Sequence, residues 1–232
     1  MRSAVTPSAS AEPSVAGGVR LDSPLGAELD GLTDRLIHRR GSRLLLPLLI
    51  RLRLSPNAVT LGGLALGVVA AWQFWHATVP SALLGLLFYA LEAVADHADG
   101  DLARLTGRES VLGRRLDVSA DTASNVLVVL GMTATAATTG GPATLPAGVA
   151  AAAGILASSL LVNFFPPPMD RAGHAALRLA NRDMFYLVLI GFILLLWKAE
   201  WLLPSLIWVL AVGSQAYWLL CLAQRTLPRR RR

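Results

Sequence analysis

The centre of the chain reads Asp96-His97-Ala98-Asp99-Gly100-Asp101-Leu102-Ala103-Arg104 and, eight residues later, Gly113-Arg114-Arg115-Leu116-Asp117-Val118-Ser119-Ala120-Asp121. Two aspartate pairs therefore lie beside long apolar runs: Asp96 and Asp99 are three residues apart, and Asp117 and Asp121 are four residues apart. Carboxylates at membrane depth are costly and are kept mainly for ion or substrate binding. At this spacing each pair projects from one side of a helix. The pattern predicts a cation site in an all-helical membrane protein.

The composition supports a membrane protein. The chain has 232 residues, of which 54% are hydrophobic and 16% charged, and its mean hydropathy is +0.53. Its 21 basic and 15 acidic residues give a net charge of +6. In a membrane protein such a balance indicates anionic lipid headgroups and topology rather than nucleic acid, which requires a basic face on a soluble module. The single cysteine, Cys221, cannot form an internal disulfide.

The apolar segments predict a bundle of six transmembrane helices over residues 56–223. Each segment is close to the ~20 residues needed to cross the hydrocarbon, provided that the polar ends of the second and fifth reach the interface. The segments are Ala58–Trp75, Pro80–Ala95, Val118–Thr138, Ala143–Phe165, Met184–Trp197 and Trp201–Ala223.

The flanking regions complete a membrane domain over residues 29–225. Residues 1–28 are rich in Ala, Ser, Pro and Gly and predict a disordered tail. Residues 29–54 mix Leu and Ile with arginines, which is typical of an amphipathic helix lying in the membrane interface, although a plain basic flank that fixes topology has the same composition. Residues 226–232 form a basic tail.

The basic residues are distributed asymmetrically. With both termini and the aspartates in the cytoplasm, 20 of the 21 basic residues lie on the cytoplasmic side, and the predicted outer loops contain only Lys198. This distribution follows the positive-inside rule and favours an even number of spans in the cytoplasmic membrane. Tryptophans near the outer ends are typical of an aromatic belt: Trp72, Trp75, Trp197 and Trp201.

The four aspartates suit two divalent cations. Close carboxylates repel one another, and Mg²⁺ or Mn²⁺, which prefers oxygen ligands, removes that repulsion. Two such ions can clamp a phosphoryl group for displacement. Gly100, Ala103 and Gly113 leave space for a ligand, and Arg104 can donate to phosphate. A single Asp-x-x-Asp pair is weak, since one such aspartate can relay protons or pair with arginine, but here the whole pattern is present.

The chain resembles the CDP-alcohol phosphatidyltransferase family. Asp96–Asp121 is similar to the family signature in every fixed position and in its spacing, and Ser55-Pro56-Asn57-Ala58-Val59-Thr60 resembles the opening of the family's first helix. The resemblance covers roughly residues 30–225. It implies a six-helix enzyme that moves a phosphoalcohol group from a CDP-alcohol, here CDP-diacylglycerol, to an acceptor hydroxyl and releases CMP.

The resemblance also implies roles for individual residues. Asp96, Asp99, Asp117 and Asp121 would hold two Mg²⁺ or Mn²⁺ ions, and Asp121 would also be the general base. The cytidine diphosphate site would consist of Gly100, Ala103, Arg104 and Gly113, with smaller contributions from Asn57 and Thr60. A homodimer is a further expectation from the family.

The acceptor is not identified by the sequence. Arg182 and Asp183, together with Arg114 and Arg115, could form a basic pocket for an acceptor phosphate, to which Arg178, Asn181, Tyr186 and Asn125 could add. The same residues could equally be positive-inside flanks and a helix cap. The possible products include phosphatidylglycerophosphate, phosphatidylinositol phosphate and soluble phosphodiesters.

Two other functional classes are compatible with intramembrane carboxylates but fit this sequence less well. A cation transporter also needs intramembrane carboxylates, but it requires polar residues through the whole membrane thickness, whereas these acids gather near one face. An inactive scaffold would show a decayed signature, and no signature residue is missing.

Overall fold

The chain forms a bundle of long helices. The computed structural model describes residues 33–165 and 182–226, and these ranges contain no strand, which confirms the all-helical fold class for them. In chain order the elements are the π-helix η1 (Asp34–His38), α2 (Arg39–Arg51), α3 (Pro56–Trp75), α4 (Val79–Thr106), α5 (Val111–Gly140), the 3-10 helix η2 (Pro142–Thr144), α6 (Leu145–Phe164), α8 (Arg182–Lys198), the 3-10 helix η3 (Glu200–Leu202) and α9 (Leu203–Thr226).

A long helix occupies most or all of each predicted span. Four stretches are long and apolar enough to cross a membrane, namely Pro56–Trp75, Val79–Thr106, Pro142–Phe164 and Glu200–Ala223. Of the other two helices, α5 carries polar side chains along its first half, and α8 has only 17 residues. Membrane crossing by all six helices therefore stays a prediction.

The helices that carry the aspartates are longer than predicted. α4 continues through the acidic residues to Thr106, where Gly107 adopts a left-handed conformation with φ +62° and ends the helix. α5 begins at Val111 because the Ser110 side chain accepts a hydrogen bond of 2.9 Å from the Gly113 amide. Both aspartate pairs thus lie on regular helix, and their helical spacing is realised.

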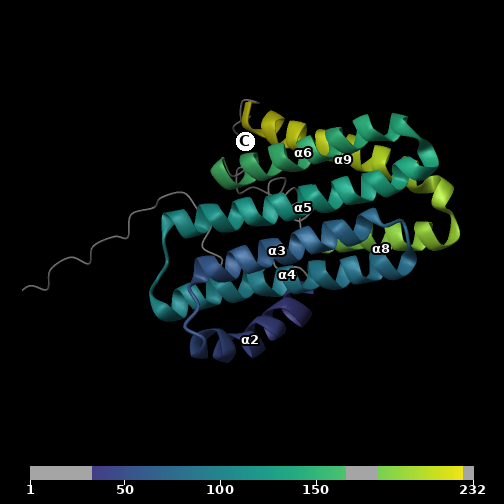
Figure 1. Ribbon diagram of the computed structural model, residues 1–232. Helices are drawn as coiled ribbons and strands as arrows, with labels where there is room; N and C mark the ends of the chain where they lie inside the picture. The colour runs from purple at the N-terminus through teal and green to yellow at the C-terminus, as the bar shows by residue number, and fades with distance from the viewer. Residues whose placement is uncertain (1–32, 166–181, 227–232) are drawn as a thin grey trace, which may run out of the picture.

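The helices lie side by side, with α5 in the middle of the view (Figure 1). α3 packs against both α4 and α5, α6 packs against α5 and α9, and α8 contacts α4. α2 lies outside the bundle against α4. The loop between α4 and α5, the start of α3 and α2 gather at the left-hand end of the view, which is the end that carries the aspartates.

Glycines let α3 and α5 approach closely. A Cβ atom added to Gly131 of α5 would lie 2.4 Å from the Ala71 carbonyl oxygen of α3. A Cβ atom added to Gly67 of α3 would lie 2.2 Å from the Ser124 hydroxyl of α5. Small residues of this kind allow backbone contact between helices in a membrane. The close crossing fixes α5 relative to α3, and therefore Asp117 and Asp121 relative to the start of α3.

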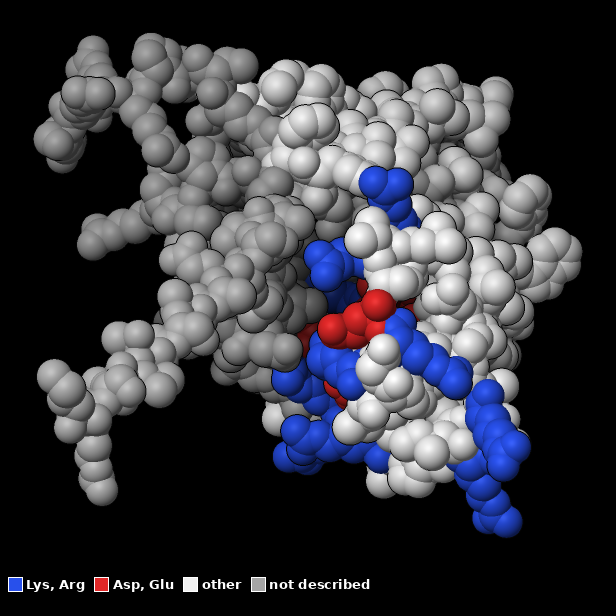
Figure 2. Space-filling model, turned by 90° about the vertical axis from the view of Figure 1, so that its left-hand side faces the viewer, with Lys and Arg blue, Asp and Glu red and all other residues white. Residues whose placement is uncertain are grey.

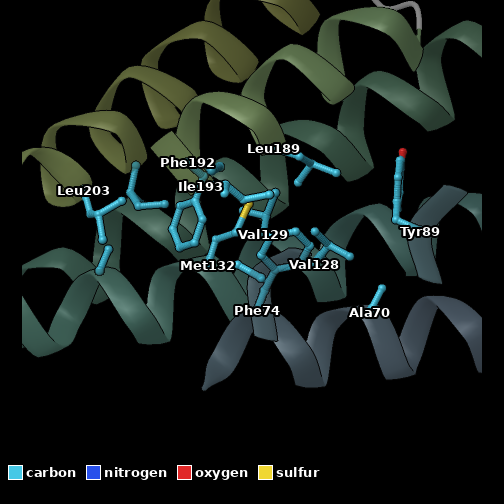
Figure 3. Packing of buried hydrophobic residues seen from close by; sticks show 14 of the residues in the cluster. Ala70, Phe74, Tyr89, Val128, Val129, Met132, Leu189, Phe192, Ile193 and Leu203 are labelled. Atoms are coloured by element: carbon cyan, nitrogen blue, oxygen red, sulfur yellow. The ribbon is translucent and has the colours of Figure 1, made fainter. Parts of the chain in front are cut away.

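A buried apolar core joins the helices of both halves of the chain. Figure 3 shows Phe74, Val128, Met132 and Phe192 packed together, and all four are almost completely buried. The Phe74 and Phe192 rings meet edge to face with centroids 5.8 Å apart. The same cluster includes Tyr89, whose hydroxyl donates to Asn125, so the core extends to the acidic end of the bundle.

The small residues of α6 pack within the chain. Gly148 faces Thr133 of α5, and Gly154 faces Ser214 of α9, each so closely that a Cβ atom would collide. Gln215 of α9 also donates a hydrogen bond of 2.7 Å to the Ala150 carbonyl. These glycines therefore serve helix packing inside one protomer.

The bundle exterior and its two ends differ in character. Large apolar side chains such as Leu61, Leu87 and Leu220 are exposed on the sides of the helices. The four tryptophans of the predicted belt are also exposed and belong to the ends of α3 and α8 and to η3, opposite the aspartates. Lys198 lies there too, 3.7 Å from the centre of the Trp197 ring.

The N-terminal region is described from Thr33. α2 falls within the predicted segment 29–54 and exposes Leu44 and Leu48 while burying Ser42 and Leu49. Its position at a membrane interface stays a prediction. The predicted tails, 1–28 and all but the first residue of 226–232, lie outside the described residues, as do Arg178 and Asn181.

Candidate active site

α4 presents three acidic side chains on one face. Glu92, Asp96 and Asp99 are separated by four and three residues, so they follow one another along the same side of the helix. Glu92 is 2% exposed and Asp99 is 4% exposed. Burial of this kind requires each carboxylate to find a compensating partner.

α5 places its two aspartates against those of α4. The carboxylate of Asp117 is close enough to Asp96, Asp99 and Asp121 for their charges to act on it. Its Oδ1 atom is buried and has no hydrogen-bond partner among the residues that the structure describes. The structure therefore brings together the four aspartates that the sequence singled out.

Arg182 at the start of α8 lies between the two aspartate pairs. One guanidinium nitrogen, Nη1, donates a hydrogen bond of 3.1 Å to Asp96 Oδ2, and the other, Nη2, donates to Asp121 Oδ1. The arginine side chain is only 12% exposed. A positive charge thus bridges carboxylates from both helices in the structure.

A hydrogen-bonded chain orients Asp121. Asn125, one turn further along α5, donates from Nδ2 to Asp121 Oδ2 at 3.3 Å. The hydroxyl of the buried Tyr89 on α4 donates to Asn125 Oδ1 at 2.7 Å. These two hydrogen bonds, from side chains of α4 and α5, fix the side-chain orientation of Asp121.

The start of α3 contributes to the same end. Ser55 caps the helix by accepting from the Ala58 amide at 3.2 Å, which fixes the first turn. In the next turn the Thr60 hydroxyl donates to Asp99 Oδ2. Asn57 lies near Gly113 of α5, where an added Cβ atom would be 3.3 Å from Asn57 Oδ1. Three residues predicted for the nucleotide site are therefore adjacent to the aspartates or to each other.

The remaining predicted nucleotide residues lie on α4. A Cβ atom added to Gly100 would meet only the Arg104 guanidinium, at 3.9 Å, so the space beside Gly100 is open. Ala103 is half-buried one turn before the helix ends. Arg104 donates to Asp101 Oδ1 at 2.6 Å, and Asp101 also accepts from Ser42 of α2 at 2.6 Å. The structure thus pairs Arg104 with Asp101.

The residues predicted for the acceptor are divided by the structure. Arg182 reaches the aspartates, whereas Arg114 and Arg115 are exposed and form no ion pair with an acidic residue in the described part of the chain. Asp183 accepts hydrogen bonds from the amide and the hydroxyl of Thr33. Asp183 therefore ties the residues before η1 to α8.

Figure 2 shows this end of the bundle from outside. Acidic side chains lie in the middle of the face and basic side chains surround them. Described basic residues at this end include Arg104, Arg108, Arg114 and Arg115 from the α4–α5 region. A negatively charged centre with a positive rim suits cations held in the centre and phosphate groups held at the edge.

The aspartates fit divalent cations on the geometry of this structure. The donor set consists entirely of carboxylate oxygens, which Mg²⁺ and Mn²⁺ prefer. The buried Asp117 Oδ1 and Glu92 Oε2 atoms lack partners, and the Arg182 guanidinium sits where positive charge is needed. The candidate ligands for such ions therefore lie on α4 and α5.

Comparison with known proteins identifies the family to which this acidic site belongs. The model of the CDP-alcohol phosphatidyltransferase family matches residues 53–219, which include every residue of the acidic site from Glu92 to Arg182. The chain belongs to the CDP-alcohol phosphatidyltransferase family. The resemblance inferred from the signature is thereby confirmed.

Two curated relatives of this phosphatidyltransferase family are similar to part of the chain. Cholinephosphotransferase 1 of Gallus gallus is 39% identical over 87 residues, covering 34% of this chain and 26% of its own. Archaetidylinositol phosphate synthase of Pyrococcus horikoshii is 31% identical over 84 residues, covering 36% of this chain and 43% of its own. The chain spans less than half the length of either relative. Neither relative is a transporter by name, and the transporter alternative gains no support.

Sequence reasoning missed Glu92 and Tyr89. Glu92 reads as one acidic residue at the end of an apolar run, yet it lies one turn before Asp96, and that spacing was the available signal. Tyr89 lies about one helical turn before Glu92 on α4. It is buried, and its hydroxyl donates to Asn125. Its role depends on how α4 and α5 are both packed against α3, which the sequence does not specify.

Proposed function

We propose that the chain transfers a phosphoalcohol group from a CDP-alcohol to an acceptor hydroxyl and releases CMP, in phospholipid or phosphodiester biosynthesis. The observation that carries this proposal is the convergence of four aspartates from two helices in a chain of this family. The two relatives are named for transfer of cholinephosphate and for synthesis of an archaetidylinositol phosphate, which are reactions of related form.

Asp96, Asp99, Asp117 and Asp121 would hold two divalent cations, Mg²⁺ or Mn²⁺. When bound, such ions screen the diphosphate of the donor and stabilise the charge that develops on the CMP leaving group. The partnerless Asp117 Oδ1 and the arginine that bridges Asp96 and Asp121 support this assignment.

The donor nucleotide would lie against the start of α3 and the facing turns of α4 and α5. Gly100 leaves open space beside the aspartates, and Gly113 with Asn57 forms a close-packed edge next to it. Thr60 holds Asp99 in place. Arg104, released from Asp101, can donate two parallel hydrogen bonds to a phosphate, and Ala103 keeps the approach clear. We take the donor to be CDP-diacylglycerol, since the helix sides next to the site are apolar.

Asp121 is the group that we assign as general base. It accepts the proton of the acceptor hydroxyl while the acceptor oxygen bonds to the phosphorus that carries the donor alcohol. The bond from that phosphorus to the oxygen shared with CMP breaks, and CMP leaves with the electron pair. Asn125 and Tyr89 keep the Asp121 carboxylate oriented. Arg182 must leave Asp121 Oδ1 before the base can act.

The acceptor would enter from the side of α8. Arg182 is the described cation nearest the base, so an acceptor that carries a phosphate could draw the guanidinium away from Asp121. The sequence also predicts Arg114, Arg115 and Asp183 for the acceptor; Arg114 and Arg115 are exposed near the start of α5, and Asp183 accepts hydrogen bonds from Thr33. Charge distribution supports a cytoplasmic orientation of the site in the cell membrane. We also propose that the protein is a homodimer. Native mass spectrometry in detergent measures the number of chains in the complex.

The test is CMP release by purified protein in detergent with Mg²⁺ or Mn²⁺, CDP-diacylglycerol and a panel of acceptor alcohols. We expect one acceptor to support turnover. Asp121→Asn should lower turnover by about 10²–10⁴-fold, the range for loss of a general base, while the variant still binds the nucleotide. Glu109→Gln, in the exposed loop between α4 and α5, is the matched control and should behave as the native chain.

Two results would overturn the proposal. Native rates of CMP release from Asp121→Asn would remove this residue from the mechanism. Cation flux through proteoliposomes without any CDP-alcohol, together with no CMP release across the panel, would replace the transferase with a transporter.

A further inference from the structure

A second cluster of metal-ligating side chains lies beside the aspartates. Asp34 and His38 come from η1, and His97 comes from α4. One ligand atom from each of the three residues lies within 4.8 Å of the other two. His38 is completely buried, and the side chains of Asp34 and His97 are 13% and 23% exposed.

Hydrogen bonding fixes which nitrogen of His97 faces the cluster. Nδ1 lies 2.9 Å from the Ala93 carbonyl oxygen, and because a carbonyl can only accept, Nδ1 carries a hydrogen. Nε2 lies 3.6 Å from Asp34 Oδ1. When Nε2 carries no hydrogen, its lone pair and the Asp34 carboxylate oxygen face the same point, where one cation can bind both atoms.

His38 is oriented in a similar way. Its Nδ1 atom lies 2.8 Å from the same Asp34 Oδ1, and its Nε2 atom lies 2.9 Å from the Tyr186 hydroxyl of α8. Histidines that bind metals usually have their second nitrogen held by a carbonyl or another polar group. Ala93 and Tyr186 provide such partners here.

Asp34 supplies an ionised ligand. Burial raises its pKa, but the hydrogen bond with His38 and nearby positive charges outweigh burial and lower the pKa to about 2. Its Oδ1 atom lies next to both histidine rings and offers an oxygen ligand to a metal ion.

We propose that Asp34, His38 and His97 form a site for a transition-metal ion such as Zn²⁺, distinct from the aspartate site. Two nitrogens and one oxygen are ligands that Zn²⁺ prefers, whereas Mg²⁺ prefers oxygen alone. The 3.6 Å separation of His97 Nε2 and Asp34 Oδ1 matches two ligands of a tetrahedral ion with bonds of about 2.0–2.2 Å. The His38 Nδ1 atom lies 2.8 Å from the same oxygen, which is a hydrogen-bond distance, so this pair must move apart when the ion binds. On binding, His38 changes tautomer: its proton moves from Nδ1 to Nε2, and the Tyr186 hydroxyl turns so that its oxygen accepts a hydrogen bond from Nε2.

The ion would join separate parts of the fold. It would connect η1 to α4 directly and, through His38 and Tyr186, to α8. Thr33 already connects the same region to Asp183 of α8. A metal at this position would therefore hold the N-terminal segment against the helices that carry the aspartates. The site does not depend on the proposed transferase activity.

The experiment measures Zn²⁺ bound to tag-free, full-length protein in detergent with saturating Mg²⁺, so that the aspartates are occupied. We expect the native chain to bind one Zn²⁺ more than His38→Ala, and Zn²⁺ affinity to fall at least tenfold in that variant. His76→Ala is the matched control, because His76 is exposed at the end of α3 opposite the aspartates and should not affect binding.

His97→Gln provides a second variant, since glutamine preserves a hydrogen-bonding side chain. Zn²⁺ should raise the thermal unfolding midpoint of the native chain and of His76→Ala but of neither cluster variant, while Mg²⁺ binding is retained in all. Equal Zn²⁺ binding by the native chain and by both cluster variants overturns the proposal. Absence of Zn²⁺ binding to the native chain also overturns it, and His97 is then assigned as an imidazolium paired with Asp34.

Discussion

At the scale of single residues, Arg182 determines the charge of the aspartate site. Its guanidinium pairs with Asp96 and Asp121, one from each carboxylate pair. A divalent ion that binds these aspartates must compete with this cation or displace it. The arginine compensates the carboxylates, and under the proposed function it would lower their affinity for metal ions.

Replacing Arg182 should therefore strengthen metal binding. We expect Arg182→Gln to bind Mn²⁺ about tenfold more tightly without substrates. The substitution removes a positive charge that repels the metal ion, and relief of about 1.4 kcal/mol of repulsion raises the affinity tenfold. Titration of Mn²⁺ followed by electron paramagnetic resonance measures it. Arg115→Gln, an exposed arginine of α5, is the control and should leave affinity unchanged. Weaker binding by Arg182→Gln would show that the arginine supports the site instead of competing for it.

At the scale of helices, the site depends on how closely α3 and α5 cross. Gly131 lies against the backbone of Ala71, and this contact sets the distance between the two helices. The same crossing positions Thr60 and Asn57 of α3 near the aspartates.

Adding one methyl group at this crossing should destabilise the bundle. In Gly131→Ala the new Cβ atom meets the Ala71 carbonyl oxygen, and overpacking of this kind costs about 1–3 kcal/mol. Thermal unfolding in detergent should show a lower midpoint. Gly62→Ala, on α3 with nothing within 4 Å of the added atom, is the matched control and should be unaffected or slightly stabilised. Equal midpoints for the two variants would mean that the helices tolerate a wider crossing.

The helices and the aspartate signature could be predicted from sequence because both are local. Apolar length and helical spacing located α3, α4, α5, α6, α8 and α9, and the two pairs of aspartates repeat at one turn. Helix ends were less accurate, since α5 begins seven residues early at a serine cap. The cluster of Asp34, His38 and His97 joins residues about 60 positions apart in the chain. Arg182 and its partner Asp96 are 86 positions apart. Such pairings depend on tertiary packing, which local patterns do not encode.

At the scale of the whole molecule, the two ends of the bundle differ in their charged residues and in their tryptophans. The aspartates and the described arginines share one end, while Lys198 and the exposed tryptophans lie at the other. This polarity supports a single orientation in the membrane.

Cysteine labelling should show that orientation. The native Cys221 is buried, so it gives little background. We expect His76→Cys, at the tryptophan end, to react with a membrane-impermeant maleimide in right-side-out vesicles, and Glu109→Cys, at the aspartate end, to react in inside-out vesicles. The opposite pattern would place the aspartates outside the cell.

The position of Arg182 in the chain has a consequence for how relatives can diverge. All four aspartates and the residues assigned to the nucleotide precede the middle of α5, whereas Arg182 and Asp183 begin α8. Under the proposed function, selection can alter the second half to admit a new alcohol while the machinery for the cytidine donor is inherited unchanged.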